Sequence, residues 1–215
     1  MRDIILFDLD GTLTDPALGI TNSILYALEK MDREKPPRES LYRFIGPPLV
    51  PAFREFLGMT EEEANRALTL YREYFSVTGL FENTPYSGVE TALAQLKEAG
   101  CTLVLATSKP EKFARRILEH FRLAEYFTHI CGASMDEKRN TKDAVIGYAL
   151  EKLGHPEQSR LIMVGDRHHD VEGAAVFGIP TVGVLWGYGS REELENAGAQ
   201  SAVPDMTGMI AALLN

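Results

Sequence analysis

The sequence predicts an α/β protein: a Rossmann-like, doubly wound parallel sheet core with an all-helical cap domain inserted into it. Three observations predict this fold. Short apolar runs alternate with helical patterns over most of the 215 residues, which is typical of βαβ units around a parallel sheet. One long segment near the N-terminus shows helical periodicity alone. Acidic, hydroxyl and basic residues follow the apolar runs, at the edge where open parallel sheets bind ligands.

Five apolar runs are the expected strands. The first is "IILFDL" at residues 4–9, which ends among aspartates. The other four are "TLVLAT" at 102–107, "THICGA" at 128–133, "LIMVG" at 161–165 and "TVGVL" at 181–185.

The segments between these strands carry residues that typically begin and end helices. Two segments show the capping-box pattern, in which Ser or Thr is followed three residues later by Glu. The pairs are Ser87 with Glu90 and Ser190 with Glu193. Thr141 suits the N-cap of the helix "KDAVIGYALEKLG". The remaining signals are Pro110 in a first helical turn, and Gly100 and Gly154 at helix ends.

Residues 16–82 form the expected cap, and residues 1–15 and 83–215 form the expected catalytic core. The cap segment shows two apolar stripes at helical spacing, the second behind a capping-box pair. The flanks "TDPALG" and "ENTPYSG" contain Pro, Gly and Thr and suit paired hinges. The stripes are Ile20, Ile24, Ala27, Leu28 and Met31, and Ala64, Ala67, Leu68, Tyr71 and Phe75, with the pair Thr60 and Glu63.

The composition argues against several function classes. The net charge is −9, with 31 acidic against 22 basic residues, so we expect no nucleic acid polymer as partner, because such binding needs a basic patch. The two cysteines, Cys101 and Cys131, lie in apolar runs and suit reduced core positions. The first apolar run is too short for a signal peptide or membrane span. We therefore expect a cytoplasmic protein that is a monomer or weak dimer and has no membrane partner.

Reactive side chains follow four of the five strands. Asp8 and Asp10 are unexpected for the fold alone, because two neighbouring carboxylates at the end of a buried strand repel each other unless a cation compensates their charge. Because the carboxyl ends of parallel strands share one edge, all of these residues should meet there. They are Asp8, Asp10, Gly11 and Thr12 after the first strand, Thr107, Ser108 and Lys109 after the second, Lys142 beyond the third, and Asp166 and Asp170 after the fourth.

This set suits Mg²⁺ and a phosphoryl group. Asp8, Asp166 and a backbone carbonyl near Asp10 offer the oxygen ligands that Mg²⁺ prefers, with Asp170 nearby. Thr107 and the N–H groups after it, at a helix start, should donate hydrogen bonds to phosphoryl oxygens. The expected phosphate contacts are Gly11, Thr12, Thr107, Ser108 and Lys142.

Asp8 is the expected nucleophile, since a carboxylate can accept a phosphoryl group to give an aspartyl-phosphate. Asp10 lies two residues further on, so an extended backbone would point both side chains the same way. A turn at Gly11 would instead direct Asp10 toward the leaving group. There it would protonate the departing alkoxide and later deprotonate the attacking water.

The motifs "DLDGTLTD", "ATS", Lys142 and "GDRHHD", in this order, resemble the four motifs of the haloacid dehalogenase-like hydrolase superfamily. The helical insertion after the first motif resembles the cap of its phosphoglycolate phosphatase subgroup. The resemblance implies that Asp8 is the nucleophile and Asp10 the acid/base. It also implies that Asp166 is a metal ligand and Asp170 a metal ligand or outer-shell carboxylate. Asp10 separates the chain from the dehalogenases that name the superfamily, which lack that aspartate.

More narrowly, "GITNSILYALE", "FIGPPL" and "GDRHHDVEGA" resemble a bacterial branch described as 5′-nucleotidase-like or phosphoglycolate phosphatase-like. The third motif departs from the common Lys-Pro form and reads "EKRNTKD". Lys138 and Lys142 are therefore rival candidates for its lysine. We favour Lys142, because Thr141 suits a helix start and would fix the lysine on a rigid element.

Two further features have competing interpretations. "RFIGPPL", residues 43–49, suits an ordinary turn between two helices. It equally suits a cap loop that faces the substrate, with Arg43 and Gly46 as candidate binding residues. His168 and His169 suggest zinc, but adjacent side chains rarely converge on one ion and no matching Cys/His spacing occurs elsewhere in the sequence. We expect both histidines on a loop surface, one of them near the metal ligands.

The sequence therefore predicts a Mg²⁺-dependent phosphatase acting on a small phosphate ester through an aspartyl-phosphate. The preferred substrate class is a nucleoside 5′-monophosphate, with 2-phosphoglycolate or another small organophosphate as the alternative. One alternative is a phosphomutase, which uses the same core but returns the phosphoryl group to the substrate. A second alternative is a phospho-acceptor receiver module, which shares the acidic pocket but has no helical insertion after its first strand. A third is a catalytically inactive binding protein, which would not need both Asp8 and Asp10.

Overall fold

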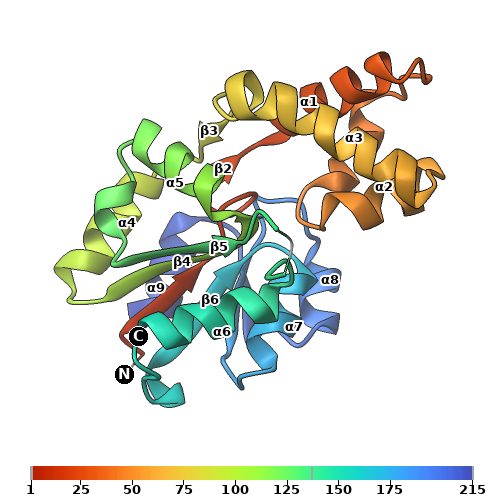
Figure 1. The fold of residues 1–215 in the computed structure, drawn as a ribbon. Coiled ribbons are helices and arrows are strands. Elements are labelled where there is room, and N and C mark those ends of the chain that lie inside the picture. The colour runs from red at the N-terminus through yellow and green to blue at the C-terminus, as the bar shows by residue number, and fades with distance from the viewer. Residues whose placement is uncertain (1, 137, 215) are drawn as a thin grey trace. The chain divides into compact units, whose positions relative to one another are not determined.

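The computed structural model describes residues 2–136 and 138–214, which form two compact units (Figure 1). The core unit comprises Met1–Thr14 and Pro85–Asn215, and the helical unit comprises Asp15–Thr84. The expected cap, 16–82, ends within two residues of these boundaries. The helical segment is thus a continuous insertion between two parts of the core unit.

The core unit is built on a parallel sheet. Within the described residues the sheet has six strands in the order β5-β4-β1-β6-β7-β8. The five predicted strands are present and the sixth, β8, was missed, because its three residues are too short and too polar to stand out. The strands are β1 (Ile4–Phe7), β4 (Thr102–Pro110), β5 (His129–Ala133), β6 (Leu161–Gly165), β7 (Thr181–Val184) and β8 (Ser201–Val203).

The strand order places the topological switch point at β1. The chain adds β4 and β5 on one side of β1 and then β6, β7 and β8 on the other. Phe7, the last residue of β1, is level with Leu105 of β4 and Val164 of β6. In an open α/β sheet the crevice beyond such a switch point is where ligands bind. Asp8 follows Phe7 directly into this position.

Helices cover both faces of the sheet, and Figure 1 shows α6 and α9 on opposite faces. On one face, α6 and α7 pack through residues such as Val145 and Ala174 against Leu6 and Met163 of the sheet. Cys101 and Cys131 are buried and form no disulfide, as predicted. The helices of the core unit are α4 (Val89–Glu98), α5 (Glu111–His120), α6 (Lys142–Lys152), α7 (His168–Ala175), α8 (Arg191–Asn196) and α9 (Met206–Leu214), with the short turns η3 (Ala124–Tyr126) and η4 (Gln158–Arg160).

The predicted helix starts have mixed outcomes. The Ser87/Glu90 capping box is wrong: Gly88, at φ 84°, is the N-cap of α4, and no side chain caps it. Thr141 is the N-cap of α6, but its hydroxyl makes no capping hydrogen bond. Ser190 does cap α8 by accepting from the backbone N of Glu193 at 3.0 Å. The Glu193 carboxylate turns away from this box and binds residues of α7, as described below.

The helical unit contains the two predicted apolar stripes, on α1 and α3. Ile24, Ala27 and Leu28 of α1 are buried, and α1 contacts α3. The predicted capping box at Thr60 and Glu63 is formed, with distances of 2.8 and 3.2 Å. The elements are α1 (Ala17–Lys30), η1 (Arg38–Phe44), α2 (Leu49–Leu57), α3 (Glu61–Tyr74) and η2 (Phe75–Gly79).

The two segments that connect the units pair with each other. β2 (Thr14–Asp15) and β3 (Thr84–Pro85) form a two-stranded sheet at the points that the sequence marks as paired hinges. Among the described residues, no helix is both long enough and apolar enough to span a membrane.

Candidate active site

The first part of the site is the tight turn that follows β1. The backbone N of Asp8 continues the sheet by donating to Val164 O at 2.9 Å. The chain then reverses, because the N–H groups of Leu13 and Thr14 both donate to Leu9 O, at 2.9 and 3.0 Å. The turn leaves the Asp8 side chain buried at the end of the sheet.

Lys142 links two of the carboxylates. It is the first residue of α6, and its Nζ lies 2.8 Å from Asp8 Oδ1 and 2.7 Å from Asp170 Oδ1. The same ammonium donates to Ala106 O at 3.1 Å. Burial alone lowers the pKa of Lys142, but the attraction of Asp170 and Asp8 outweighs it, and the net result is a raised pKa. Lys142 is therefore a permanent cation at this edge of the sheet.

Asp166, directly after β6, is completely buried. One of its oxygens accepts from Tyr188 N at 2.8 Å, and the other lies 3.4 Å from the Thr12 hydroxyl, which donates to it. Burial raises the pKa of Asp166 well above its usual value, and repulsion from Asp170 and Asp8 raises it further. Neutral hydrogen bonds alone do not compensate this charge.

Two glycines make room for Asp166. A Cβ on Gly11 would lie 2.2 Å from Asp166 Oδ2, and a Cβ on Gly187 would lie 2.4 Å from the same atom. Gly11 also has φ 82°, a conformation that residues with a side chain rarely adopt. Only glycine fits at these positions while the carboxylate keeps its place.

The three buried carboxylates fit a hard cation. Oxygen atoms of Asp8, Asp166 and Asp170 lie within 4.8 Å of one another. One lysine pairs with two of them, so the group keeps excess negative charge when all are ionised. Burial also raises the pKa of Asp170, to about 6, despite its lysine partner. An all-oxygen donor set with uncompensated charge matches Mg²⁺.

Asp10 is held separately from this cluster. Its Oδ2 lies 2.7 Å from Nζ of Lys109, and both side chains are largely buried. Burial raises the pKa of Asp10, while the positive charge of Lys109 opposes the shift. Asp8 and Asp10 therefore have different lysine partners although they are two residues apart, as expected if the turn at Gly11 directs them differently.

Comparison with known proteins identifies the chain. The sequence profile of the haloacid dehalogenase-like hydrolase family matches residues 5–184, which include every residue of the cluster described above.

The chain belongs to this family.

Similar proteins include several phosphatases. A 5′-nucleotidase of Pseudomonas aeruginosa is 44% identical over 190 residues, which cover 88% of this chain and 86% of the relative. The crystal structure of a predicted phosphatase from Clostridium acetobutylicum has a TM-score of 0.96 and 47% identity, and the match covers 100% of this chain and 99% of that one. A phosphoglycolate phosphatase of Pseudomonas syringae is 26% identical, over 99% of this chain and 80% of the relative. The chain is thus a phosphatase of the haloacid dehalogenase type.

One group of relatives has a different activity in its name. The tyrosine-protein kinase PtkA of Mycobacterium tuberculosis is 43% identical over 192 residues, or 89% of this chain. This chain spans about 65% of the length of PtkA. Two relatives of nearly equal identity therefore carry names for different phosphoryl-transfer reactions.

The structure of this phosphatase separates the two candidate lysines of the third motif. Lys142 is buried against Asp8 and Asp170, whereas the side chain of Lys138 is 86% exposed and lies 3.7 Å from Asp136. Thr107 is buried at the end of β4, but the expectation that a helix starts beside it is wrong. β4 continues to Pro110 and α5 begins at Glu111, so Ser108 is on the strand and half-buried.

Two features of the site were not predicted: the partner of Lys109 and the contribution of the loop after β7. Lys109 was expected at this edge as a residue after the second strand, but its pairing with Asp10 was not; it lies in the stretch between Thr107 and Pro110 where the β4–β5 register shifts. The loop after β7 supplies Tyr188 N to Asp166, and Trp186 Nε1 donates to Thr12 O at 3.0 Å. The glycine-rich "WGYG" after a predicted strand was the available signal for this loop.

The predicted cap residues belong to the helical unit. Arg43, at the end of η1, donates from Nη2 to Phe56 O at 3.0 Å, and its guanidinium lies 4.5 Å from the centre of the Phe56 ring. Gly46 has φ 110° in the turn before α2. Both contacts of Arg43 serve the local fold of this unit.

Proposed function

We propose that this phosphatase hydrolyses a small phosphomonoester in a Mg²⁺-dependent reaction through an aspartyl-phosphate on Asp8. The observation that carries the proposal is the pairing of neighbouring aspartates with different lysines, Asp8 with Lys142 and Asp10 with Lys109. The Asp8 carboxylate thereby lies beside a permanent cation, Lys142. The Asp10 carboxyl group, whose pKa burial raises, can hold and release a proton.

Asp8, Asp166 and Asp170 would hold the Mg²⁺ ion, together with a backbone carbonyl near Asp10. The bound ion would neutralise part of the carboxylate charge and withdraw electron density from the phosphoryl oxygens. Thr107, Ser108 and the backbone of Gly11 and Thr12 are the proposed additional contacts for the phosphoryl group.

In the first step an oxygen of Asp8 forms a bond to phosphorus as the ester P–O bond breaks. The leaving alkoxide takes a proton from Asp10. A carboxyl group with a raised pKa is suited to this transfer, because it is more often protonated near neutral pH than an ordinary aspartate. The negative charge on the phosphoryl oxygens is stabilised by Lys142, which pairs with Asp8 before the reaction.

In the second step Asp10, now ionised, removes a proton from a water molecule that attacks the phosphorus of the aspartyl-phosphate. The acyl-phosphate P–O bond breaks, which regenerates the Asp8 carboxylate and releases inorganic phosphate. Lys109 stabilises the ionised form of Asp10 between the two steps, since its Nζ is 2.7 Å away. One acid/base residue therefore serves both steps.

The substrate class we propose is a nucleoside 5′-monophosphate, which rests on the 44% identity to the 5′-nucleotidase of Pseudomonas aeruginosa. The rival is 2-phosphoglycolate or another small organophosphate. The test is phosphate release with and without Mg²⁺ from nucleoside 5′-monophosphates, 2-phosphoglycolate, sugar phosphates and pyrophosphate, with Asp8→Asn protein as the blank. We expect Mg²⁺-dependent release with the highest kcat/KM for a nucleotide.

Each other outcome contradicts a defined part of the proposal. A preference for 2-phosphoglycolate would overturn the substrate class and retain the mechanism. Isomerisation of a sugar phosphate without phosphate release would indicate a mutase. Transfer of phosphate from ATP to protein tyrosine, with no hydrolysis across the panel, would indicate the activity named for PtkA.

A further inference from the structure

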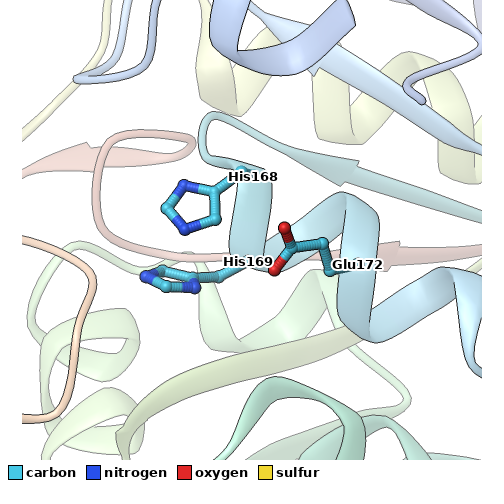
Figure 2. Close-up of side chains that lie close together, drawn as sticks. All are labelled: His168, His169 and Glu172. Carbon is cyan, nitrogen blue, oxygen red and sulfur yellow. The ribbon is translucent and has the colours of Figure 1, made fainter. Parts of the chain in front are cut away.

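His168 and His169 do not lie on a loop, as the sequence suggested, but form the first turn of α7. Their ring centres are 3.8 Å apart, with the ring planes inclined at 45°. Glu172 lies one helical turn further on, where residues at i and i+4 share a face. Ligand atoms of all three side chains lie within 4.8 Å of one another, and Figure 2 shows both rings and the carboxylate on one side of the helix start.

A carboxylate outside this group fixes the orientation of His168. Oε1 of Glu193, on α8, lies 2.8 Å from His168 Nδ1. The same oxygen accepts from His168 N at 3.0 Å and from Arg167 Nε at 2.8 Å. Because Glu193 is an acceptor in each of these contacts, Nδ1 is the nitrogen that donates to it, and Nε2 is the ring nitrogen left to face a metal ion. Metal-binding histidines are commonly held by a carboxylate in this way.

We propose that His168, His169 and Glu172 form a binding site for one divalent transition-metal ion, such as Zn²⁺, Ni²⁺ or Cu²⁺. Two imidazole nitrogens and one carboxylate are donors that these ions accept, whereas Mg²⁺ prefers oxygen ligands throughout. This site is chemically distinct from the cluster of Asp8, Asp166 and Asp170, which offers oxygens alone.

The donors need a modest rearrangement to bind one ion. Metal–nitrogen bonds of about 2.0–2.1 Å in tetrahedral geometry place neighbouring donors roughly 3.3 Å apart, against up to 4.8 Å here. Both histidines are only partly buried and Glu172 is exposed, so their side chains can turn. The charge of Arg167 is already paired with Glu193 at 2.8 Å, which reduces its repulsion of a second cation.

The test is binding of Zn²⁺ and Cu²⁺ to the full chain in saturating Mg²⁺, which occupies the oxygen cluster. We expect one Zn²⁺ per chain by calorimetry and nitrogen hyperfine splitting from two imidazoles in the Cu²⁺ electron paramagnetic resonance spectrum. His168→Asn is the most informative variant, because an Asn amide can still donate a hydrogen bond to Glu193 but lacks the Nε2 atom that would bind the metal ion. It and Glu172→Gln should weaken Zn²⁺ binding about 100-fold or more, and Glu193→Gln roughly 10–100-fold.

Two controls keep the site distinguishable from other histidines and from the oxygen cluster. His155→Asn, an exposed histidine at φ 54° where Asn is well tolerated, should bind Zn²⁺ like the parent chain. Asp166→Asn should retain the two-imidazole Cu²⁺ signal. Unchanged Zn²⁺ affinity in His168→Asn and Glu172→Gln, or loss of all binding in Asp166→Asn, would overturn the proposal.

Discussion

Two groups of candidate metal ligands share the first turn of α7 but differ in what the fold requires of them. Asp170 points inward, is buried, and joins Asp8 and Asp166 beside Lys142. His168 and His169, two and one residues earlier, are half-exposed and lie near the exposed Glu172. One helical turn thus presents oxygen donors to the interior and nitrogen donors outward.

The difference lies in the cost of burial. Carboxylates removed from water are unfavourable unless counter-charges or hydrogen bonds compensate them, so the inner group depends on Lys142 and, in our proposal, on Mg²⁺. The outer group keeps solvent and needs no ion to be stable. Changes to the inner group should therefore affect catalysis and folding, whereas changes to the outer group should affect only its own ligand.

The largest expected effect is that of Asp8→Asn. The amide removes the nucleophile, and we expect kcat to fall roughly 10⁴-fold or more, as for other essential nucleophiles. The measurement is phosphate release, with circular dichroism to verify folding. Asp32→Asn is the matched control, since Asp32 is exposed and its φ of 51° suits Asn. Substantial activity in Asp8→Asn would contradict the assignment of Asp8 as nucleophile. An equal fall of kcat in Glu172→Gln would show that the inner and outer groups do not differ in their effect on catalysis.

Asp10→Asn should be the next most damaging change. It removes proton transfer, which is worth roughly 10²–10⁴-fold, and leaves Asp8, Asp166 and Asp170 in place. We therefore expect a low kcat with nearly unchanged Mg²⁺ affinity, measured by calorimetry. A normal kcat would refute the acid/base role, and a large loss of Mg²⁺ affinity would place the Asp10 side chain in the metal site.

Lys142→Ala should lower kcat/KM roughly 10²–10³-fold, because the phosphoryl charge loses its nearest ammonium. It also leaves two buried carboxylates without their partner, so the melting temperature should fall in metal-free buffer and recover partly with Mg²⁺. Lys138→Ala is the matched control, since that side chain is exposed. The reverse ranking of the two variants would move the third motif to Lys138.

Gly11→Ala tests whether the space beside Asp166 is required. Gly11 and Gly100 have similar φ values, 82° and 87°, so alanine strains both backbones equally. Only at Gly11 would the new Cβ meet Asp166, at 2.2 Å, whereas no atom lies within 4 Å at Gly100. We expect Gly100→Ala to lose roughly 1–2 kcal/mol of stability through backbone strain, and Gly11→Ala to lose more than that and most of its activity, because of the added clash with Asp166. Equal kcat values in the two would show that Asp166 tolerates displacement.

The smallest expected effect is a pH dependence of stabilisation by Mg²⁺. The folded-state pKa of Asp170, about 6, lies above its usual value of 3.8, mainly because of burial. The metal-free fold therefore retains a proton that the unfolded chain releases, and its stability falls as pH rises from about 4 through 6. Mg²⁺ competes with that proton below pH 6, so its stabilising effect should grow between pH 5 and pH 8.

Thermal unfolding with and without Mg²⁺ measures this effect. Binding at 100 times Kd contributes about 2.7 kcal/mol, and each kcal/mol raises the melting temperature by about 2–4 °C in a chain of this size. Asp170→Asn should remove the part of the pH dependence centred near pH 6, whereas Asp166, whose pKa burial also raises, keeps its own contribution. A Mg²⁺-induced shift that is equal at pH 5 and pH 8 would show that Asp170 does not titrate against the metal.

The sequence contained enough information for the fold class and for most of the inner site. The apolar runs identify five strands, because buried parallel strands need continuous hydrophobic residues. Their order along the chain then implies that the residues at the end of each strand meet at one edge: Asp8 and Asp166 do follow neighbouring strands, and Thr107 lies near the end of a third, β4. β8 has no continuous hydrophobic run. It is a strand because it pairs with β7, and its composition alone does not predict that.

Only the tertiary structure decided which side chains pair. Lys109 pairs with Asp10 from the stretch of β4 where its register against β5 shifts, and the Glu193 carboxylate binds Arg167 and His168 instead of its own helix start. Both outcomes depend on contacts between residues far apart in the sequence, and local propensity says nothing about such contacts. The sequence determined by itself which chemical groups would gather at the end of the sheet. Packing decided which of them would be neighbours, because a charge in the interior is stable only beside a partner that the fold brings to it.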